Sequence, residues 1–268
     1  MQRRNILHRL AARLRSEATD FRLFGAGSIR QHLCRMTRRR ECSLRLAGVG
    51  PVTVRPGETD LASFRQIFGG LEYRWPVAAV EEAIDARYRA ILASGRKPVI
   101  VDGGAYVGAS SLWFRSKFSQ AHIVAIEPEP ESLRLLERNL ASFGPATVLQ
   151  AAIGAAPGTV KLVAAESFWA TQVQRSPSGN GVRVTTMNDA FALVPDGEPL
   201  LAKINIEGFE SDVFSDRLQW LDRVSLLFIE PHDWLMPGER TSGSFQKALG
   251  ERDFHLFIVG PHLCYARL

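Results

Sequence analysis

A glycine-rich turn follows the apolar run at residues 99–101, in the segment Val99-Ile-Val-Asp-Gly-Gly-Ala-Tyr-Val-Gly108. Glycines at positions 103, 104 and 108 allow the backbone to approach a ligand closely, and they allow the following helix to pack tightly on the strand. An ordinary strand-to-helix turn that needs positive φ angles would also use glycine. The spacing and position of the three glycines favour a nucleotide-type ligand over that simpler explanation.

The glycine spacing and a neighbouring carboxylate indicate which nucleotide to expect. Gly103, Gly104 and Gly108 read G-G-x-x-x-G, whereas a dinucleotide fingerprint reads G-x-G-x-x-G and directs N–H groups at a pyrophosphate. Asp102 stands at the end of the strand, where its charge would repel a pyrophosphate and attract a cation. S-adenosylmethionine carries a sulfonium and an α-ammonium group and has no phosphate. These residues therefore favour S-adenosylmethionine over NAD.

A second carboxylate ends the next apolar run, in the segment Ile123-Val-Ala-Ile-Glu127-Pro128. Glu127 follows Gly104 by 23 positions, and a carboxylate about 20 residues beyond the glycine turn can accept the ribose hydroxyls of a nucleoside. A surface carboxylate before a helix is the alternative. The apolar character of the run before Glu127 favours the ribose contact.

Two later apolar runs end in polar residues that could carry chemistry. Asn205 and Glu207 follow the run at 200–204, and Glu230 and His232 follow the run at 224–229. Ligands of an open parallel sheet bind outside the carboxyl ends of the strands, which predicts that these residues lie near Asp102 and Glu127. We expect His232 to be a general base, oriented by Glu230, with Glu207 as the other candidate base. Asn205 and Glu230 could instead satisfy loop backbone groups.

These residues need a parallel sheet to bring them together, and the chain from residue 99 onward has the required pattern. Apolar strand-like runs alternate with amphipathic helical segments, which predicts an α/β fold with a doubly wound, mostly parallel sheet. The expected strands are 99–101, 123–126, 147–149, 200–204 and 224–229, and the expected helices are 109–118, 131–143 and 209–221. Residues 254–259 and 263–267, joined by Gly260-Pro261, predict an antiparallel C-terminal edge. Residues 160–163 and 182–186 could pair as two further strands.

An N-terminal extension precedes this region. The sequence predicts two parts, a basic helical extension with a hairpin and lid helices at 1–95 and a ligand-binding domain at 96–268. Expected elements of the extension are a helix at 6–14, a hairpin of 43–46 with 52–55, and helices at 59–68 and 77–94. Its aromatic residues could form a lid or a homodimer surface. Phe168 and Trp169, in a later loop, could stack on a sugar or cover the core.

Charge is concentrated at the start of the chain. Twelve arginines and three acidic residues precede Leu46, so this segment has a net charge of +9. The whole chain has a net charge of +5, so the remaining residues together carry −4. Such a segment could contact anionic surfaces, or it could simply be a solvated amphipathic helix. Basic charge confined to one segment gives no reason to expect a specific nucleic-acid partner. Three scattered cysteines, no long apolar run and no secretory signal predict a cytoplasmic protein without a metal site.

Taken together, the motifs resemble those of the FkbM family of methyltransferases over residues 52–229. The resemblance rests on the segments VDGGAYVG (101–108), IEPEP (126–130), NL (139–140), AAIG (151–154), TMND (186–189), KINIEGFE (203–210) and IEPH (229–232). It implies a class I methyltransferase fold, S-adenosylmethionine as donor, and O-methylation of a sugar, glycolipid or polyketide hydroxyl. The residues expected to bind the donor are Asp102, Gly103, Gly104, Ala105, Gly108, Glu127, Pro128 and Asn205.

Two positions depart from the family pattern. Asn205 stands where the family usually has Asp, and an amide cannot act as a general base. Tyr106 stands where the family often has Asn. Three alternatives therefore stay open: a nicotinamide-dependent oxidoreductase, a nucleic-acid methyltransferase, and a non-catalytic scaffold that binds the donor. The first lacks the phosphate-binding glycine spacing, the second lacks an N/D-P-P-Y-type run, and Asn205 is the best support for the third.

Overall fold

The computed structural model describes residues 16–164, 171–176 and 179–268. Contacts divide the chain into two compact units, residues 1–71 and 72–268. The helix expected at 6–14 and the aromatic pair Phe168 and Trp169 lie outside the described residues. Within the described residues, no helix combines the length and the apolar character that crossing a bilayer requires.

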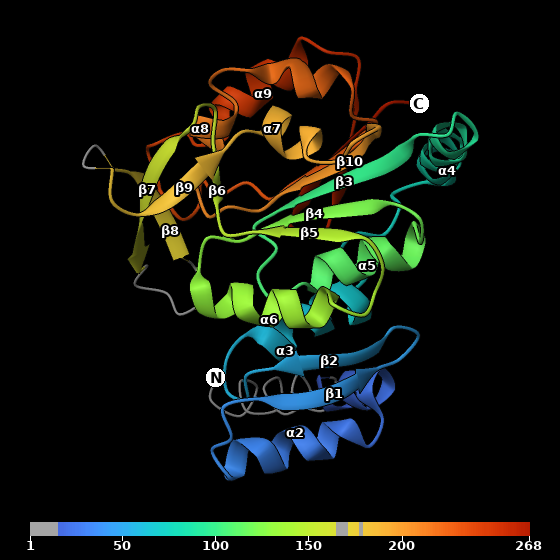
Figure 1. Ribbon diagram of the computed structural model, residues 1–268, viewed down its shortest axis with the longest axis vertical. Helices are drawn as coiled ribbons and strands as arrows, with labels where there is room; N and C mark the ends of the chain where they lie inside the picture. The colour runs from blue at the N-terminus through green and yellow to red at the C-terminus, as the bar shows by residue number, and fades with distance from the viewer. Residues whose placement is uncertain (1–15, 165–170, 177–178) are drawn as a thin grey trace, which may run out of the picture. The chain divides into compact units, whose positions relative to one another are not determined.

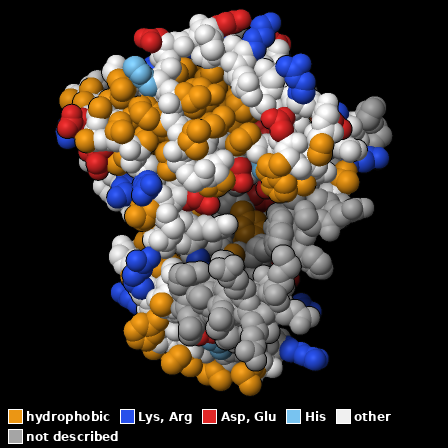
Figure 2. All heavy atoms as spheres, turned by 180° about the vertical axis from the view of Figure 1, so that it is seen from behind, with side chains coloured by type: hydrophobic (Ala, Val, Ile, Leu, Met, Phe, Trp, Pro, Cys, Tyr) orange, Lys and Arg blue, Asp and Glu red, His pale blue; other side chains and the backbone are white. Residues whose placement is uncertain are grey.

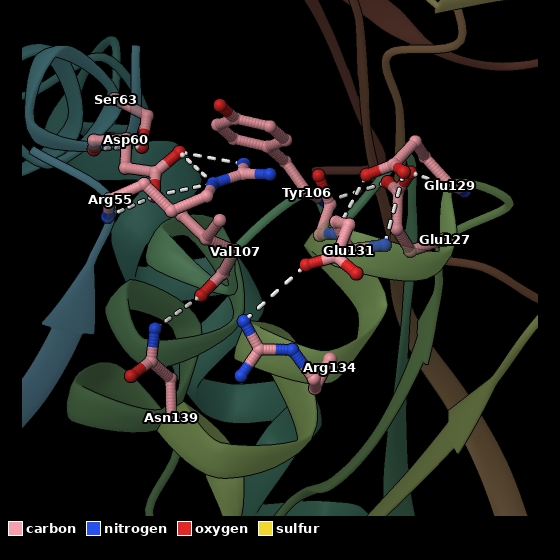
Figure 3. Close-up of polar contacts among 11 residues, drawn as sticks. Arg55, Asp60, Ser63, Tyr106, Val107, Glu127, Glu129, Glu131, Arg134 and Asn139 are labelled. Atoms are coloured by element: carbon pink, nitrogen blue, oxygen red, sulfur yellow. Dashed lines mark hydrogen bonds and ion pairs between the residues drawn. The ribbon is translucent and has the colours of Figure 1, made fainter. Parts of the chain in front are cut away.

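The N-terminal unit is built around a β-hairpin. Strands β1 (Cys42–Leu46) and β2 (Gly50–Val54) pair antiparallel, which confirms the predicted hairpin. Helix α2 (Gly27–Met36) packs on β1. The helix expected at 59–68 is instead a short α3 (Asp60–Phe64) followed by a π-helical turn, Arg65–Gly69. The buried Asp60 carboxylate fixes the start of α3, because it accepts hydrogen bonds from the backbone N–H and the guanidinium of Arg55 (Figure 3).

The larger unit contains a seven-stranded sheet with the order β12-β13-β11-β10-β3-β4-β5 (Figure 1). The strands are β3 (Lys97–Gly103), β4 (His122–Ile126), β5 (Ala146–Leu149), β10 (Gly197–Ile204), β11 (Leu226–Ile229), β12 (His255–Val259) and β13 (His262–Ala266). Strands β5, β4, β3, β10 and β11 are parallel. The chain order reverses between β3 and β10, so the topological switch point lies between these two strands.

Helices cover both faces of this sheet, which confirms the doubly wound α/β prediction. Figure 1 shows α5 (Ala109–Lys117) and α6 (Pro130–Leu140) on one face and α7 (Met187–Ala192), α8 (Glu210–Val213) and α9 (Gly243–Gly250) on the other. The central strands are buried on both faces, so their sequences are continuously apolar rather than alternating. Helix α4 (Ala78–Ala93) contacts β3 and β10 and belongs to the larger unit. The larger unit therefore begins at residue 72, earlier in the chain than the domain boundary that the sequence predicted after residue 95.

The C-terminal hairpin forms one edge of the sheet, with the last strand turned inward. Strand β13 pairs antiparallel with β11 and with β12, so β12 is the edge strand and β13 lies between them. Gly260 connects the two strands at a φ of +59°. The hairpin was expected from the sequence, but the insertion of its second strand was not. The antiparallel pairing of β13 with β11 sets that order, and a hairpin pattern alone does not reveal which of its two strands pairs inward.

A four-stranded sheet with the order β6-β9-β7-β8 lies beyond β5 in the chain. Its strands are β6 (Ala152–Ile153), β7 (Gly158–Ala164), β8 (Thr171–Arg175) and β9 (Val182–Thr185). The register pairs Val160 with Val182, so the predicted pairing of these segments is confirmed. Strand β8 and helix α9 were not expected. The helix expected at 209–221 is broken into α8 and a 3₁₀ turn, Leu218–Asp222, by Arg217 at a φ of +56°.

Candidate active site

The glycine turn at the end of β3 is packed against protein on both sides. A Cβ on Gly104, whose φ is +71°, would lie 1.8 Å from the carbonyl oxygen of Asn205, and a Cβ on Gly103 would lie 2.4 Å from Ile153 Cδ1. Gly108 is the N-cap of α5 at a φ of +91°. Backbone conformation therefore favours glycine at 104 and 108 independently of any ligand, and packing leaves little room for a side chain at 103 unless Ile153 shifts.

The N–H groups of this turn are occupied within the protein. Those of Gly104 and Ala105 both donate to the carbonyl of Ile126, at 3.0 Å each, and that of Gly108 donates to the carbonyl of Ala105 at 2.8 Å. The Tyr106 N–H donates to Glu127 Oε2 at 2.9 Å. A phosphate cradle needs several free N–H groups aimed at one point. The donors of this turn are already satisfied, so it does not offer one.

Asp102 lies below the turn and is fully buried. Its Oδ2 accepts hydrogen bonds from the hydroxyls of Ser110 and Ser111 at 2.6 Å each, and its Oδ1 lies 3.2 Å from Lys203 Nζ. Lys203 also donates to the carbonyls of Gly103 and Gly104. The lysine balances the charge of Asp102, which weakens the expectation that this carboxylate attracts a cation or repels a pyrophosphate. In this conformation Asp102 positions the turn.

Glu127 supports the same turn from β4. Its Oε2 accepts the Tyr106 N–H at 2.9 Å and its Oε1 accepts the Glu129 N–H at 3.0 Å (Figure 3). Burial raises the pKa of Glu127 to about 7, although these two N–H groups and Lys203 lower it. A carboxylate has about four acceptor positions, so two remain for ligand hydroxyls. Pro128 is partly exposed beside it.

Three further residues of the turn region were not identified as structural from the sequence. Asn139 of α6 donates its amide to the carbonyl of Val107 at 2.8 Å and so ties that helix to the turn (Figure 3). Tyr106 has a φ of +51°, a left-handed conformation in which Asn is several-fold enriched. The backbone thus explains why an Asn suits position 106. Glu129 caps α6 by accepting the N–H groups of Glu131 and Ser132.

Asn205 and Glu230 form a pair at the ends of β10 and β11. Asn205 Nδ2 donates to Glu230 Oε2 at 2.6 Å, and His262 Nε2 lies 3.5 Å from the same oxygen. The Tyr73 hydroxyl lies 3.1 Å from His262 Nε2. Burial, with the charges of Lys203 and His232, lowers the pKa of His262 to about 3, so this ring is neutral. An Asp at position 205 would place two carboxylates in contact, whereas the amide complements Glu230.

His232 is oriented by Glu210 and not by Glu230, which corrects the expected arrangement. Its Nδ1 donates to Glu210 Oε1 at 2.7 Å, and its Nε2 lies 3.4 Å from Glu207 Oε2. Glu210 is fully buried and also accepts the Gly208 N–H. The sequence analysis did not identify Glu210, although it lies three residues after Glu207 in the same motif. The conformation of the turn between the two glutamates decides which of them faces the histidine, and the sequence does not reveal that conformation.

Exposure separates the two candidate bases. The side chain of His232 is 1% exposed and that of Glu207 is 25% exposed. Glu207 has a φ of +53°, an uncommon conformation for a residue with a Cβ, and it is followed by Gly208 at +98°. This pair of left-handed residues directs the Glu207 side chain away from the regular path of a helix. The three side chains therefore form a series, with Glu210 buried, His232 in the middle and Glu207 outermost.

Several carboxylates at this edge of the sheet have raised pKa values. Burial raises the pKa of Glu207 and of Glu230, and burial together with the charge of Glu230 raises the pKa of Glu72 to about 7. Burial lowers the pKa of His232, but the hydrogen bond to Glu210 and the charges of three glutamates raise it overall. The described residues include no group of three or more His, Cys, Asp or Glu side chains arranged to hold a metal ion.

Comparisons with known proteins match the same region. A profile of the methyltransferase FkbM domain matches residues 102–249, more than half of the chain. The methyltransferase sdnD of Sordaria araneosa is 40% identical over 68 residues, which is 24% of this chain and 26% of that protein. The matched segment thus spans about a quarter of the length of this curated relative.

Solved structures give more distant similarities. Precorrin-6y C5,15-methyltransferase of Geobacter metallireducens GS-15 is 13% identical with a TM-score of 0.37, over 64% of this chain and 80% of that one. Magnesium protoporphyrin IX methyltransferase of Synechocystis PCC 6803, solved with bound S-adenosylmethionine, is 12% identical with a TM-score of 0.36, over 78% and 92%. WbdD is 15% identical with a TM-score of 0.39, over 72% and 42%.

Proposed function

This chain belongs to the FkbM methyltransferase family, and from that premise we propose that it is an S-adenosylmethionine-dependent O-methyltransferase. Its acceptor is a hydroxyl group of a sugar, glycolipid or polyketide-type small molecule. The donor is placed at the switch point between β3 and β10, beside the glycine turn, with Glu127 as the acceptor for its ribose hydroxyls. Gly104, Ala105 and Pro128 are the residues proposed to contact the donor there, together with Asn205, which directly follows β10 and packs against Gly104.

The hydrogen bonding of the glycine turn carries this proposal. The N–H groups of Gly104, Ala105 and Tyr106 are all used inside the protein, so a pyrophosphate would find no free donors there. A nucleoside without phosphate needs hydroxyl acceptors instead, and Glu127 supplies one at the end of the adjacent strand. NAD fits these groups less well than S-adenosylmethionine does.

When bound, S-adenosylmethionine supplies a methyl group on a positively charged sulfur. The protein must hold the acceptor oxygen in line with that methyl group, and it must remove the hydroxyl proton. Glu207 is the outermost member of the Glu210–His232–Glu207 series and is the one that an acceptor can reach without displacing a buried side chain. We therefore assign the proton acceptor to Glu207, with His232 as the residue that positions it and tunes its charge.

The proposal is tested first by calorimetric titration with S-adenosylmethionine and with NAD. Glu127→Gln removes the charge but keeps the shape, and the amide N–H₂ must face a backbone N–H. We expect donor affinity to fall by about 10- to 100-fold, because a hydrogen bond to a charged group is worth about 1.5–3 kcal/mol. The matched control is Glu131→Gln on α6, where the side chain is 67% exposed, and its affinity should not change.

Two outcomes of this titration would contradict the proposal. Binding of NAD alone would identify an oxidoreductase built on the same fold. Binding of neither nucleotide would indicate a scaffold that has lost the donor site. If S-adenosylmethionine binds but no hydroxyl acceptor is methylated, the protein is a non-catalytic donor-binding protein. In that case only the proposed donor-binding site is supported.

Donor binding should also depend on pH near neutrality. Burial raises the pKa of Glu127 to about 7 in the folded protein, so the carboxylate gains a proton as the pH falls through this value. A protonated carboxyl group accepts ribose hydrogen bonds less well, and the affinity for S-adenosylmethionine should therefore fall by up to tenfold per pH unit below about 7. Titrations between mildly acidic and mildly basic pH measure this slope. The slope should disappear in Glu127→Gln, and a slope that persists there would assign it to another group.

A further inference from the structure

Helix α2 of the N-terminal unit has its apolar face turned outward. Ile29, Leu33 and Met36 are spaced by four and three residues, so they lie on one side of the helix. Their side chains are 61%, 55% and 80% exposed. The residues of α2 that are buried are Gln31 and Cys34. A surface helix normally buries its apolar stripe and exposes its polar one, so this helix is inverted.

Arginines surround this stripe. Arg30 and Arg35 lie within α2, and Arg38, Arg39 and Arg40 follow directly after it. All five are exposed, and α2 contains no acidic residue. Among the described residues, none of these five arginines forms an ion pair with a carboxylate. Figure 2 shows hydrophobic side chains along the lower edge of the molecule, where Figure 1 draws α2.

This arrangement matches the helix that lies in the plane of a membrane interface. Such helices present apolar side chains to the acyl boundary and arginines or lysines to anionic headgroups. The stripe argues against a nucleic-acid partner, because phosphate contacts use the arginines but leave Ile29, Leu33 and Met36 in water. The arginines argue against pairing with a second copy of the same face, because two such faces repel each other.

We propose that the α2 face, defined as Ile29, Leu33 and Met36 with the flanking arginines, binds the surface of an anionic lipid bilayer. The three apolar side chains enter the boundary between headgroups and acyl chains. The arginines contact the lipid phosphates and carboxylates. The protein is then a peripheral membrane protein whose N-terminal unit makes the contact, and this inference is independent of the acceptor of the larger unit.

Flotation of the whole 268-residue chain with lipid vesicles tests this. We expect binding to phosphatidylcholine vesicles that contain phosphatidylglycerol, little binding to pure phosphatidylcholine, and release at high salt. The triple variant Ile29→Ser, Leu33→Ser, Met36→Ser should bind at least about tenfold more weakly, which corresponds to about 1.4 kcal/mol. Arg38→Gln, Arg39→Gln, Arg40→Gln should weaken binding to a similar degree. Both variants should keep the wild-type thermal unfolding temperature, because all six side chains are exposed.

The matched control is the double variant Leu256→Ser, Ile258→Ser on β12. These apolar side chains are 53% and 77% exposed in the other unit, so vesicle binding should be unchanged. No flotation with anionic vesicles would overturn the proposal, as would flotation that the α2 triple variant leaves intact. A wild-type dimer that the triple variant converts to a monomer would assign the face to self-association. Binding of an RNA oligonucleotide without binding of vesicles would assign the arginines to nucleic acid.

Discussion

Lys203→Met should destabilise the folded protein by about 3–5 kcal/mol, the usual cost of breaking a buried ion pair by removing one partner. Lys203 and Asp102 face each other as register partners on β10 and β3, and their side chains are 3% and 0% exposed. Without the lysine, Asp102 keeps only the hydroxyls of Ser110 and Ser111 as partners. The carbonyls of Gly103 and Gly104 also lose their charged donor.

The free energy of unfolding, measured by urea denaturation, can separate two effects: loss of the ion pair itself, and the cost of leaving the Asp102 charge buried without a partner. The double variant Lys203→Met, Asp102→Asn removes both charges and keeps a side chain that can still bond the serine hydroxyls. It should therefore be more stable than Lys203→Met alone, which gives a coupling between the two sites. Lys247→Met on α9, where the lysine is exposed, is the control and should lie within about 0.5 kcal/mol of the wild type. A loss below about 1 kcal/mol for Lys203→Met would show that the pair is not needed for stability.

This pair also marks how far the sequence alone could go. The sheet was predictable because β3, β4, β10 and β11 are buried on both faces and therefore continuously apolar. The carboxyl-end positions of Asp102, Glu127, Asn205 and Glu230 followed from that sheet. The partner of Asp102 was not predictable, because 100 residues separate it from Lys203 and only the register of β3 with β10 brings them together.

The prediction of side-chain partners at the site failed for a similar reason. Glu230 was expected to orient His232 because they are near in sequence, yet Glu230 accepts a hydrogen bond from Asn205 and His232 bonds to Glu210. The left-handed backbone at Glu207 and Gly208 decides which carboxylate faces the histidine, and no local pattern in the sequence predicts it. The sequence located the glycine turn correctly but attributed its glycines mainly to a ligand. Close packing against the Asn205 carbonyl is by itself a reason for glycine at position 104.

Glu207→Gln should lower the rate of methyl transfer by about 10²- to 10⁴-fold, the usual contribution of a positioned base, while S-adenosylmethionine binding stays near wild type. Formation of S-adenosylhomocysteine, with hydroxyl acceptors from a sugar and polyketide screen, measures the rate, and calorimetry measures donor binding. The amide of Gln cannot take up a proton at these pH values. If the Glu207→Gln variant kept the wild-type rate of methyl transfer, Glu207 would be excluded as the base.

His232 should then act through Glu207, and the pH profile distinguishes this from direct proton transfer. Burial raises the pKa of Glu207 and the charge of His232 lowers it, so loss of the imidazole should raise that pKa further. Activity rises with pH as Glu207 loses its proton, and this rising limb should shift to higher pH in His232→Ala while the plateau rate is largely recovered. Activity that His232→Ala abolishes at every pH would make the histidine the base. In that case its 1% exposed side chain must become accessible to the acceptor before each turnover.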